Sequence, residues 1–575
     1  MPKVLGISAF YHDSAAALVD ESGIIAASSE ERFTRKKHDE RFPARAIASC
    51  LTHAGVRLGD LDAVVFYEKP LLTFDRILET WLNNAPAGYR YFAASFRAWA
   101  SDKLFQKQHL LRALKALDPT FQRSRLRFAK HHQSHAASAF YPSPFERAAI
   151  LTLDGVGEWA TCTMGTADGR YLHPLVELHH PHSLGLLYSA FTAHCGFHVN
   201  GGEYKLMGLA PYGEPTYEAL ILDELIDLHD DGSFQLNMRY FDYCRALSMT
   251  GQAFDDLFGG PSRVPESEID DRHRNLAASI QAVTETIVLR MATELHKRTG
   301  MKQLCMAGGV ALNGVVNGRL LREGPFDQIW VQPAAGDAGG ALGAAFVGLY
   351  ELTDRRVQQP DGMAGSLLGP QYSPAEICSI LDRLGAHYTV MGSAEMVERC
   401  VDDLDAGGIV AWFQGRMEFG PRALGSRSIL ADARSPTTKQ QLNATVKFRE
   451  AFRPFAPAIL AEHLDTWFEL DAPSPYMSFV AACRRPHDIP ATTHVDGSAR
   501  VQSVDQQTSP LFHSLLSAFH SRTECPILIN TSFNVRGEPI VQSPEDAWRC
   551  FMGTGISAMA IGPCYLRKER QTGAS

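Results

Sequence analysis

Two stretches of the sequence share one pattern, in which a run of apolar residues leads into an aspartate among glycines. Residues 148–153 precede Asp154-Gly155-Val156-Gly157, and residues 329–333 precede Ala335-Gly336-Asp337-Ala338-Gly339-Gly340. Glycines after a strand let backbone amides approach a phosphate, and the acid can face a metal ion. One such loop is a weak signal. Because strand, glycine-rich loop and helix recur, the pattern predicts a duplicated α/β domain with nucleotide in its cleft.

Three histidines in five residues, His131, His132 and His135, lie shortly before the first of these loops. On a helix, His131 and His135 project from one face because they are four residues apart, so both rings can reach one cation. The alternative is a polar helix start with incidental histidines. A metal site needs a full ligand set, so the rest of the chain has to supply further ligands.

Length and composition exclude several classes of protein. A chain of 575 residues exceeds what one hydrophobic core usually organises, and we expect two or three domains. A net charge of -9 argues against broad non-specific binding of nucleic acid. No apolar run approaches the roughly 20 residues of a membrane helix, and the N-terminus is not a signal peptide. The 11 cysteines contain no Cys-x-x-Cys pair, which favours a reducing cytoplasm.

The chain opens as a strand over residues 4–7, a polar loop carrying His12 and Asp13, and a second strand over residues 15–19. Actin-like ATPases open in this way, and a hairpin turn with polar caps is the alternative.

The charged run 30–38 is typical of a solvated face. Residues 71–125 look largely helical. Their aromatic residues either belong to the core or face a substrate, and they are Trp81, Tyr89, Tyr91, Phe92 and Trp99. An amphipathic helix is expected over 271–299, ended by Gly300.

The second half of the chain is marked by arginines. Around residues 354–369 the sequence becomes polar and rich in Gln, Pro and Gly, which predicts an interdomain linker. Guanidinium groups suit a small planar oxyanion, since each donates two parallel hydrogen bonds. We therefore favour an anion pocket over an exposed basic surface, and its candidate residues are Arg416, Arg422 and Arg427 in a glycine-rich loop, then Lys447, Arg449, Arg453 and Arg500, and finally Asn530 and Asn534 after a strand at 527–529.

In this order, the motifs resemble the O-carbamoyltransferases of natural-product biosynthesis and nodulation-factor modification from end to end. The matching stretches are residues 12–16, 30–33, 131–135, 202–210, 308–313, 336–340, 415–430, 447–457 and 530–534. The resemblance implies an α/β chain with a duplicated actin-like ATPase domain at 1–355, a linker at 356–370 and a second α/β domain at 371–575. That second domain would be similar to the threonylcarbamoyl-adenylate synthase fold, and the first to the tRNA threonylcarbamoyl-transfer ATPase.

The resemblance also implies a two-step reaction in the cytoplasm. Carbamoyl phosphate and ATP would give carbamoyl-adenylate, and the carbamoyl group would then pass to a hydroxyl of a natural product such as an antibiotic, a macrolide or polyketide, or a sugar. The partners would be ATP, carbamoyl phosphate and this small acceptor, with neither nucleic acid nor membrane. Carbamate is unstable in water, which favours a closed pocket.

Roles carry over residue by residue from the same resemblance. His12 would be the general base for the acceptor hydroxyl, oriented by Asp13, because an imidazole with an unperturbed pKa accepts a proton at neutral pH. His132 would not be a ligand. The metal ligands would be His131, His135, Asp154 and Asp337, which favour Fe(II) or another divalent cation, with Mg²⁺ less expected to choose imidazole.

Nucleotide would be held by Lys205, Gly308, Gly309, Asn313 and Gly336. Carbamoyl phosphate would be held by Arg422, Lys447, Arg453, Arg500, Asn530 and Asn534.

Three other functions remain open on the same scaffold. A sugar kinase would need no carbamoyl-phosphate domain, and the arginine-rich second half argues against it. A tRNA-modifying carbamoyl-transfer enzyme should carry a broad basic face, which the negative net charge does not favour. An actin-like nucleotide switch would convert ATP to ADP, whereas the two-step reaction produces AMP and pyrophosphate.

Overall fold

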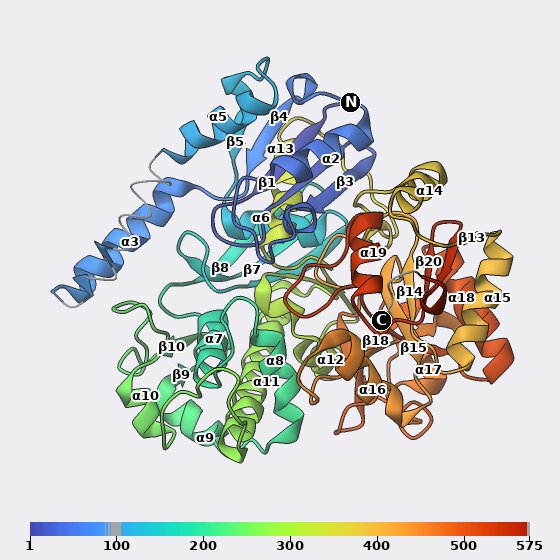
Figure 1. Ribbon diagram of the computed structural model, residues 1–575. Coiled ribbons are helices and arrows are strands. Elements are labelled where there is room, and N and C mark those ends of the chain that lie inside the picture. The colour runs from blue at the N-terminus through green and yellow to red at the C-terminus, as the bar shows by residue number, and fades with distance from the viewer. Residues whose placement is uncertain (87, 90–91, 94–104, 572–575) are drawn as a thin grey trace. The chain divides into compact units, whose positions relative to one another are not determined.

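The computed structural model describes residues 1–86, 88–89, 92–93 and 105–571 (Figure 1). The chain divides into two compact units. Unit 1 comprises residues 1–26 and 40–362, and unit 2 comprises residues 27–39 and 363–575. The second boundary lies within the stretch expected as a linker, whereas the assignment of residues 27–39 to unit 2 has no counterpart in the sequence-based division.

Unit 1 contains two five-stranded sheets with the same topology. The first has the order β3-β2-β1-β4-β5 and the second β8-β7-β6-β11-β12. In each sheet the first strand in sequence pairs antiparallel with the next strand and parallel with a strand that returns through helices. This repetition confirms the predicted duplicated α/β domain. The strands are β1 (Val4–Ser8), β2 (Ala15–Asp20), β3 (Gly23–Ser29), β4 (Ala63–Phe66), β5 (Leu126–Phe128), β6 (Arg147–Leu153), β7 (Ala160–Asp168), β8 (Tyr171–His179), β11 (Gln303–Ala307) and β12 (Gln328–Val331).

Helices cover these sheets, and unit 1 also contains a separate two-stranded hairpin. The central strands β1, β2 and β4 are buried along their whole length, as expected of strands covered on both faces. The helices and the hairpin strands are α2 (Ala44–Ala54), α3 (Pro70–Asn84), α5 (Gln106–Leu117), α6 (His131–Phe140), α7 (Leu184–His194), α8 (Glu203–Leu209), α9 (Glu218–Leu220), α10 (Gln252–Leu257), α11 (Asp271–Thr299), α12 (Gly314–Glu323), α13 (Asp337–Tyr350), β9 (Ile226–Leu228) and β10 (Phe234–Leu236). The predicted helix 271–299 is confirmed as α11, with Gly300 in the left-handed region at its end.

Helix α13 packs against α6 and against strands β1, β2 and β4. Small residues allow backbone to meet backbone there. A Cβ atom at Gly343 of α13 would overlap the carbonyl oxygen of Ser134 in α6. A Cβ atom at Gly6 of β1 would likewise overlap the carbonyl oxygen of Ala341. This close approach fixes the N-terminal turns of α6 and α13 beside each other.

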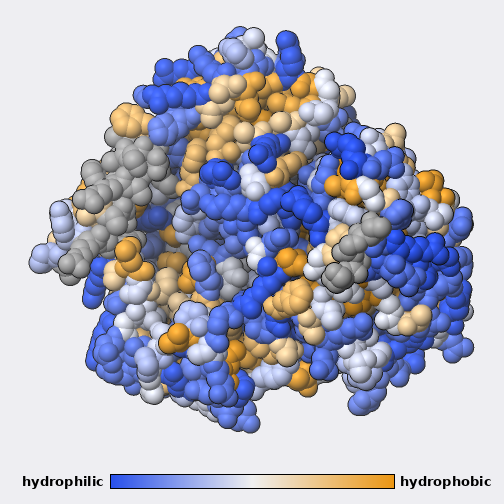
Figure 2. Space-filling model, in the orientation of Figure 1, coloured by the Kyte–Doolittle hydropathy of each residue, from blue (hydrophilic) through white to orange (hydrophobic). Residues whose placement is uncertain are grey.

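The region 71–125 is helical in its described parts, namely α3 and α5. The rings of Trp81 and Phe92 stack with centroids 4.4 Å apart, and Tyr89 is exposed. Tyr91 and Trp99 lie outside the described residues. On the face drawn in Figure 2, hydrophobic residues occur in small groups between hydrophilic ones. No helix among the described residues is both long and apolar enough to cross a membrane.

Unit 2 is a second α/β domain, built on one mixed sheet with the order β13-β21-β20-β14-β15-β19-β16-β18-β17. Its strands are β13 (Thr389–Val390), β14 (Val410–Phe413), β15 (Arg427–Asp432), β16 (Ala456–Leu460), β17 (Phe479–Ala482), β18 (Ser498–Val504), β19 (Ile527–Ser532), β20 (Ala558–Ile561) and β21 (Cys564–Arg567). Its helices are α1 (Glu31–Thr34), α14 (Pro374–Arg383), α15 (Ser393–Asp405), α16 (Pro436–Leu442), α17 (Leu464–Trp467), α18 (Pro510–Thr523) and α19 (Pro544–Met552).

The charged run 30–38 is not a solvated face. Glu30, Glu31 and Arg32 are buried, and Arg32 donates a hydrogen bond of 2.8 Å to the carbonyl of Gly420. Arg35 donates to the carbonyls of Pro539 and Ile540, each at 2.7 Å. The expectation fails because the carbonyls that accept from Arg32 and Arg35 lie hundreds of residues away in the sequence, where local composition cannot reveal them.

The close contact of α13 with α6 predicts a severe effect of Gly343→Ala. A methyl group has no space beside the Ser134 carbonyl, so the helices must separate, at a cost of about 2–3 kcal/mol or more. Thermal unfolding followed by circular dichroism should show a clearly lowered melting temperature. Gly336→Ala is the control, because a Cβ atom there meets nothing within 4 Å. Equal melting temperatures for the two variants would contradict the packing described here.

Candidate functional site

Four side chains of unit 1 converge from three elements. His131 and His135 lie on α6, Asp154 follows β6, and Asp337 is the first residue of α13. The two imidazole Nε2 atoms are 3.1 Å apart. The Oδ2 atom of Asp154 is 3.1 Å from Nε2 of His131 and 3.7 Å from Nε2 of His135, and Oδ1 of Asp337 is 3.7 and 3.6 Å from the same nitrogens. One potential ligand atom from each residue lies within 4.8 Å of the others.

The electrostatics of this cluster fit a bound cation. Burial by itself would lower the pKa of His135, but its hydrogen bonds to Asp154 and Asp337 raise that pKa to about 9. Burial would raise the pKa of Asp154, but hydrogen bonds from the two imidazoles hold it well below its usual value. The carboxylates and the imidazoles thus stabilise each other's charged forms. Two imidazole nitrogens and two carboxylates make a donor set suited to a borderline divalent cation.

Backbone amides and neighbouring side chains hold the cluster in place. Gly309 donates its amide proton to Oδ1 of Asp154 at 2.9 Å, leaving Oδ2 to face the imidazoles. The hydroxyl of Tyr67 donates to Oδ2 of Asp337 at 3.4 Å. Gly157 passes so close to His131 that a Cβ atom there would lie 2.9 Å from the ring carbon Cδ2. Tyr67, which directly follows strand β4, was not singled out from the sequence as a site residue.

Glu158 anchors the start of helix α6 and was also missed. The amide of His131 donates to both carboxylate oxygens of Glu158, at 3.0 and 3.1 Å, and the amide of Lys69 donates to Oε1 at 2.9 Å. A carboxylate at a helix N-terminus satisfies unpaired amides and interacts favourably with the helix dipole. The sequence signal was slight, one glutamate directly after the Asp-Gly-Val-Gly loop.

His12 lies at the edge of the cluster. Its Nδ1 atom is 3.0 Å from Oδ2 of Asp13, and its Nε2 atom is 3.6 Å from Oδ2 of Asp337. Burial by itself would lower the pKa of His12, but Asp337 and Asp13 raise it to about 9. The premise that this imidazole has an unperturbed pKa is therefore wrong, because both of its nitrogens face carboxylates.

His132 is oriented differently from the other two histidines. Its Nδ1 atom is 2.7 Å from the hydroxyl of Thr152, and burial lowers its pKa to about 3, so the ring is neutral. It does not take part in the four-residue cluster.

The residues predicted to hold nucleotide lie at strand ends of unit 1. Gly308 has a φ of 90°, and a Cβ atom there would overlap the carbonyl oxygen of Leu153. Gly336 precedes α13 in open space. Asn313 serves as the N-cap of α12, where its Oδ1 accepts from two amides and its Nδ2 donates to Gln281 at 2.9 Å. Lys205 on α8 lies over the ring of Phe197 at 5.7 Å. Two of these residues therefore have structural contacts of their own.

Unit 2 contains a cluster of arginines. Burial lowers the pKa of Arg500 well below its usual value, and the neighbouring cations Arg422, Arg449 and Arg453 lower it further. The Nε atom of Arg500 is buried without a hydrogen-bond partner. Cations gathered in this way are costly to bury, so the arrangement favours a bound anion. All four arginines were candidates for the anion pocket from the sequence, although Arg449 was not among the carbamoyl-phosphate ligands that the family resemblance implied.

The remaining predicted anion ligands contact protein groups. Strand β19 continues to Ser532, so Asn530 lies within the strand rather than after it. Lys447 donates to the carbonyls of Ser532 and Asn534 and to Oδ1 of Asn534, and its burial lowers its pKa well below the usual value. The Nδ2 group of Asn530 donates to Gln502 at 2.7 Å, but its Oδ1 atom is buried without a partner.

Two of the three loop arginines have structural roles. Arg416 donates to the carbonyls of Leu368 and Gly369. Arg427 lies on the ring of Phe413 at 3.6 Å, and burial lowers its pKa to about 10. The loop is fixed by Glu418, whose Oε1 accepts from the amides of Leu424, Ser426 and Arg427 at 2.8, 2.8 and 3.0 Å. Arg422 is the loop arginine that faces the other cations.

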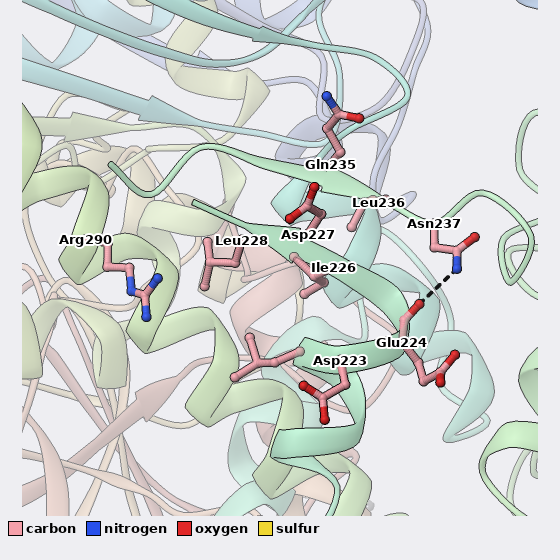
Figure 3. Close-up of a pocket in the computed structure, with 10 residues that line it drawn as sticks. Asp223, Glu224, Ile226, Asp227, Leu228, Gln235, Leu236, Asn237 and Arg290 are labelled. Carbon is pink, nitrogen blue, oxygen red and sulfur yellow. Dashed lines mark hydrogen bonds between the residues drawn. The ribbon is translucent and has the colours of Figure 1, made fainter. Parts of the chain in front are cut away.

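A separate hollow of about 620 Å³ lies along the β9–β10 hairpin of unit 1 (Figure 3). Asp223, Glu224 and Asp227 line it together with Arg290 of α11, and Asn237 donates a hydrogen bond to the carbonyl of Glu224. None of the residues predicted to form a site lines this hollow.

The anchoring of α6 predicts different effects for two substitutions of Glu158. Glu158→Ala leaves the buried His131 amide without an acceptor and should cost about 2 kcal/mol, seen as a lowered melting temperature. Glu158→Gln keeps an acceptor oxygen, so its melting temperature should fall less than that of the alanine variant. Hydrogen exchange followed by mass spectrometry should show faster exchange at the start of α6 in the alanine variant alone. If both variants exchange at the wild-type rate, Glu158 does not anchor the helix.

Known proteins can be compared with these two units. The sequence matches the family models described as Carbamoyltransferase N-terminus, over residues 3–346, and Carbamoyltransferase C-terminus, over residues 401–568. An uncharacterized protein of Synechocystis is 52% identical, covering 99% of this chain and 97% of its own. Nodulation protein NolNO of Sinorhizobium fredii is 38% identical, covering 98% and 79%. The 3'-hydroxymethylcephem-O-carbamoyltransferase of Streptomyces clavuligerus is 26% identical, covering 97% and 98%.

Among solved structures, component A of the (R)-2-hydroxyglutaryl-CoA dehydratase of Acidaminococcus fermentans is similar, with a TM-score of 0.33 and 15% identity over 61% of this chain and 99% of its own. The family models together cover most of both units, and the relatives match over nearly the full length of this chain. The chain therefore belongs to the carbamoyltransferase family.

Proposed function

We propose that the protein is an ATP-dependent O-carbamoyltransferase that forms carbamoyl-adenylate and transfers its carbamoyl group to a hydroxyl of a small acceptor. The observation that carries this proposal is the convergence of His131, His135, Asp154 and Asp337 in unit 1. A protein that only stored or transported an anion would not need such a cluster. The arginine cluster of unit 2 supplies the second requirement, a place for carbamoyl phosphate.

The first half-reaction is assigned to unit 2. Water cleaves carbamoyl phosphate to carbamate and inorganic phosphate, and carbamate oxygen then attacks the α-phosphorus of ATP, which releases pyrophosphate. Each of these species is an anion. Arg422, Arg453 and Arg500, with Arg449 beside them, would stabilise their charge in a site where burial strengthens electrostatic interactions.

The second half-reaction is assigned to unit 1. The acceptor hydroxyl attacks the carbamoyl carbon, the bond to the adenylate oxygen breaks, and AMP leaves. A divalent cation held by the four-residue cluster, for which we propose Fe(II), would offset the charge of Asp154, Asp337 and the departing phosphate. Gly309 and Gly336 lie beside these two acids and would let the nucleotide approach the backbone.

His12 is the proposed acceptor of the hydroxyl proton. Asp13 accepts a hydrogen bond from Nδ1, which leaves Nε2 as the atom that takes up the proton. Nε2 faces Asp337, the residue that most raises the pKa of His12. A divalent cation bound to Asp337 would offset the charge of that carboxylate and lower the pKa of His12, which would let Nε2 accept the proton of the acceptor hydroxyl.

The acceptor is proposed to be a hydroxylated natural product such as an antibiotic, a macrolide or polyketide, or a sugar. Support comes from the cephem O-carbamoyltransferase and the nodulation protein among the relatives. Helix α3 is the proposed wall for this acceptor. It contacts the loop after Asp154 directly, since the indole nitrogen of Trp159 donates to Asp75 and Arg76 donates to the carbonyl of Gly157.

The four-residue cluster predicts that His135→Ala loses metal. Removing one of four ligands should weaken binding of a divalent cation by about 100-fold or more, because second-sphere changes alone cost 10–100-fold. Metal content after anaerobic loading with Fe(II), and titration with Co(II) followed by its visible spectrum, would measure the change.

The matched control for that measurement is His132→Gln, on the same helix but outside the cluster. It should keep the metal content of the wild type. Both variants need circular dichroism to show that they are folded. Unchanged metal content in a folded His135→Ala protein would exclude the cluster as a metal site.

The two half-reactions predict that two substitutions separate them. His12→Asn should abolish transfer to the acceptor while exchange of pyrophosphate into ATP, dependent on carbamoyl phosphate, persists. Arg500→Ala should reduce both activities by about 100-fold, because the loss of a charged hydrogen-bond donor to an anion costs roughly 3 kcal/mol. Radiolabelled ATP with product separation measures each step.

The control for Arg500 is Arg383→Ala, since Arg383 is an exposed arginine of the same unit that pairs with Glu545. It should retain both activities. Loss of exchange in the His12→Asn protein would refute the role given to His12. ADP as the main product, in place of AMP, would favour a kinase or a nucleotide switch over the proposed reaction.

A further inference from the structure

Unit 2 brings two cysteines together that are far apart in the sequence. The Sγ atoms of Cys378 and Cys564 are 3.5 Å apart. Cys378 lies in the middle of helix α14, and Cys564 is the first residue of strand β21. Both are free thiols in the structure. Neither belongs to the arginine cluster, and the proposed carbamoyl transfer uses neither of them.

The packing around these sulfurs keeps them in contact. Helix α14 lies against the turn between β20 and β21, where a Cβ atom at Gly562 would lie 2.5 Å from Cδ1 of Ile377. Ile377 precedes Cys378, and Gly562 is two residues before Cys564. Ile377, Gly562 and Pro563 also border a cavity of about 310 Å³. The two thiols are therefore held by the same contact that joins the helix to the turn.

We propose that Cys378 and Cys564 are an oxidative modification site, which forms an intramolecular disulfide when the protein meets a low-molecular-weight disulfide such as oxidised glutathione. The thiolate of Cys378 attacks one sulfur of the reagent and releases the first glutathione thiol. The sulfur of Cys564, which gives its proton to the departing glutathione thiolate, then attacks the Cys378 sulfur and releases the second glutathione thiol. Two protein thiols lose two electrons and two protons, and the reagent is reduced to two thiols.

The order of attack follows from exposure. Cys378 is half-buried, so a small reagent can reach its sulfur, whereas Cys564 is buried. Burial also raises the pKa of Cys564, so that less of it is present as the thiolate that reacts with disulfides in solution. Cys564 reacts with the mixed disulfide because it is already in contact with the Cys378 sulfur.

The bond would join helix α14 to β21, the last strand of unit 2 in the sequence. Residues 378–564 form the closed loop, which contains all strands of the sheet except β21. A disulfide across a loop of this length restricts the unfolded chain strongly. The oxidised protein should therefore unfold at a temperature about 5–10 °C higher than the reduced protein, at least for the transition of unit 2.

The experiment is to incubate the full-length protein with oxidised glutathione, block the remaining thiols, and map peptides without reduction. The number of thiols titrated after denaturation should fall by two from 11. Trypsin should release one linked pair, composed of residues 357–383 and 550–567. The second of these peptides also contains Cys550, so fragmentation has to locate the bond at Cys564.

Three variants make the result decisive. Cys550→Ser should still form the linked pair, and Cys378→Ser and Cys564→Ser should not. In the Cys564→Ser protein a single glutathione adduct should remain on Cys378, and circular dichroism should show that the variant is folded. A stable glutathione adduct on Cys378 of the wild-type protein, without a linked pair, would overturn the proposal. So would a linked pair that persists in the Cys378→Ser protein, or no loss of thiols at all.

Discussion

The close contact of helix α13 with helix α6 and strand β1 determines the geometry of unit 1. Larger side chains would hold these elements apart. The two crossing points are occupied by Gly343 and Gly6, which have no side chain, so the backbones can approach each other closely. Only then do the first turns of the two helices meet, with Asp337 on one and His131 and His135 on the other. The cluster is thus a product of backbone packing between the two repeated halves of the domain. In an enzyme of the carbamoyltransferase family, substitutions at these glycines should act on the site from a distance.

The two units differ in the buried charges that they bring together, which are opposite in unit 1 and alike in unit 2. In unit 1, each imidazole faces a carboxylate, and the two kinds of group stabilise each other's charged forms. In unit 2, arginines lie near one another, and burial adds to their mutual repulsion. The first arrangement is suited to exchanging protons for a cation, and the second to receiving an anion. This contrast supports assigning the chemistry of carbamoyl phosphate and that of transfer to different units.

Local patterns predicted the elements and much of the site, but not the partners. The i, i+4 spacing of His131 and His135 and the two glycine-flanked aspartates each indicated a metal contact, because each depends on a short stretch of sequence, and the family resemblance combined them into one set of ligands. The structure brings these four residues together. Glu158 was missed because its function is to accept amide protons from two helix starts that are far apart. Lys447 was predicted as an anion ligand, and the length of strand β19, which brings carbonyls to its ammonium group, could not be read from composition. The roles of the individual residues stay predictions.

The membership of residues 27–39 in unit 2 has a consequence for how the protein is made. Arg32 and Arg35 are synthesised hundreds of residues before the carbonyls that accept their hydrogen bonds, which belong to Gly420, Pro539 and Ile540. Synthesis at about 5–20 residues per second leaves this segment without those partners for tens of seconds. Unit 2 is therefore completed by the beginning of the chain, and no single cut between the units would release it with all of its residues.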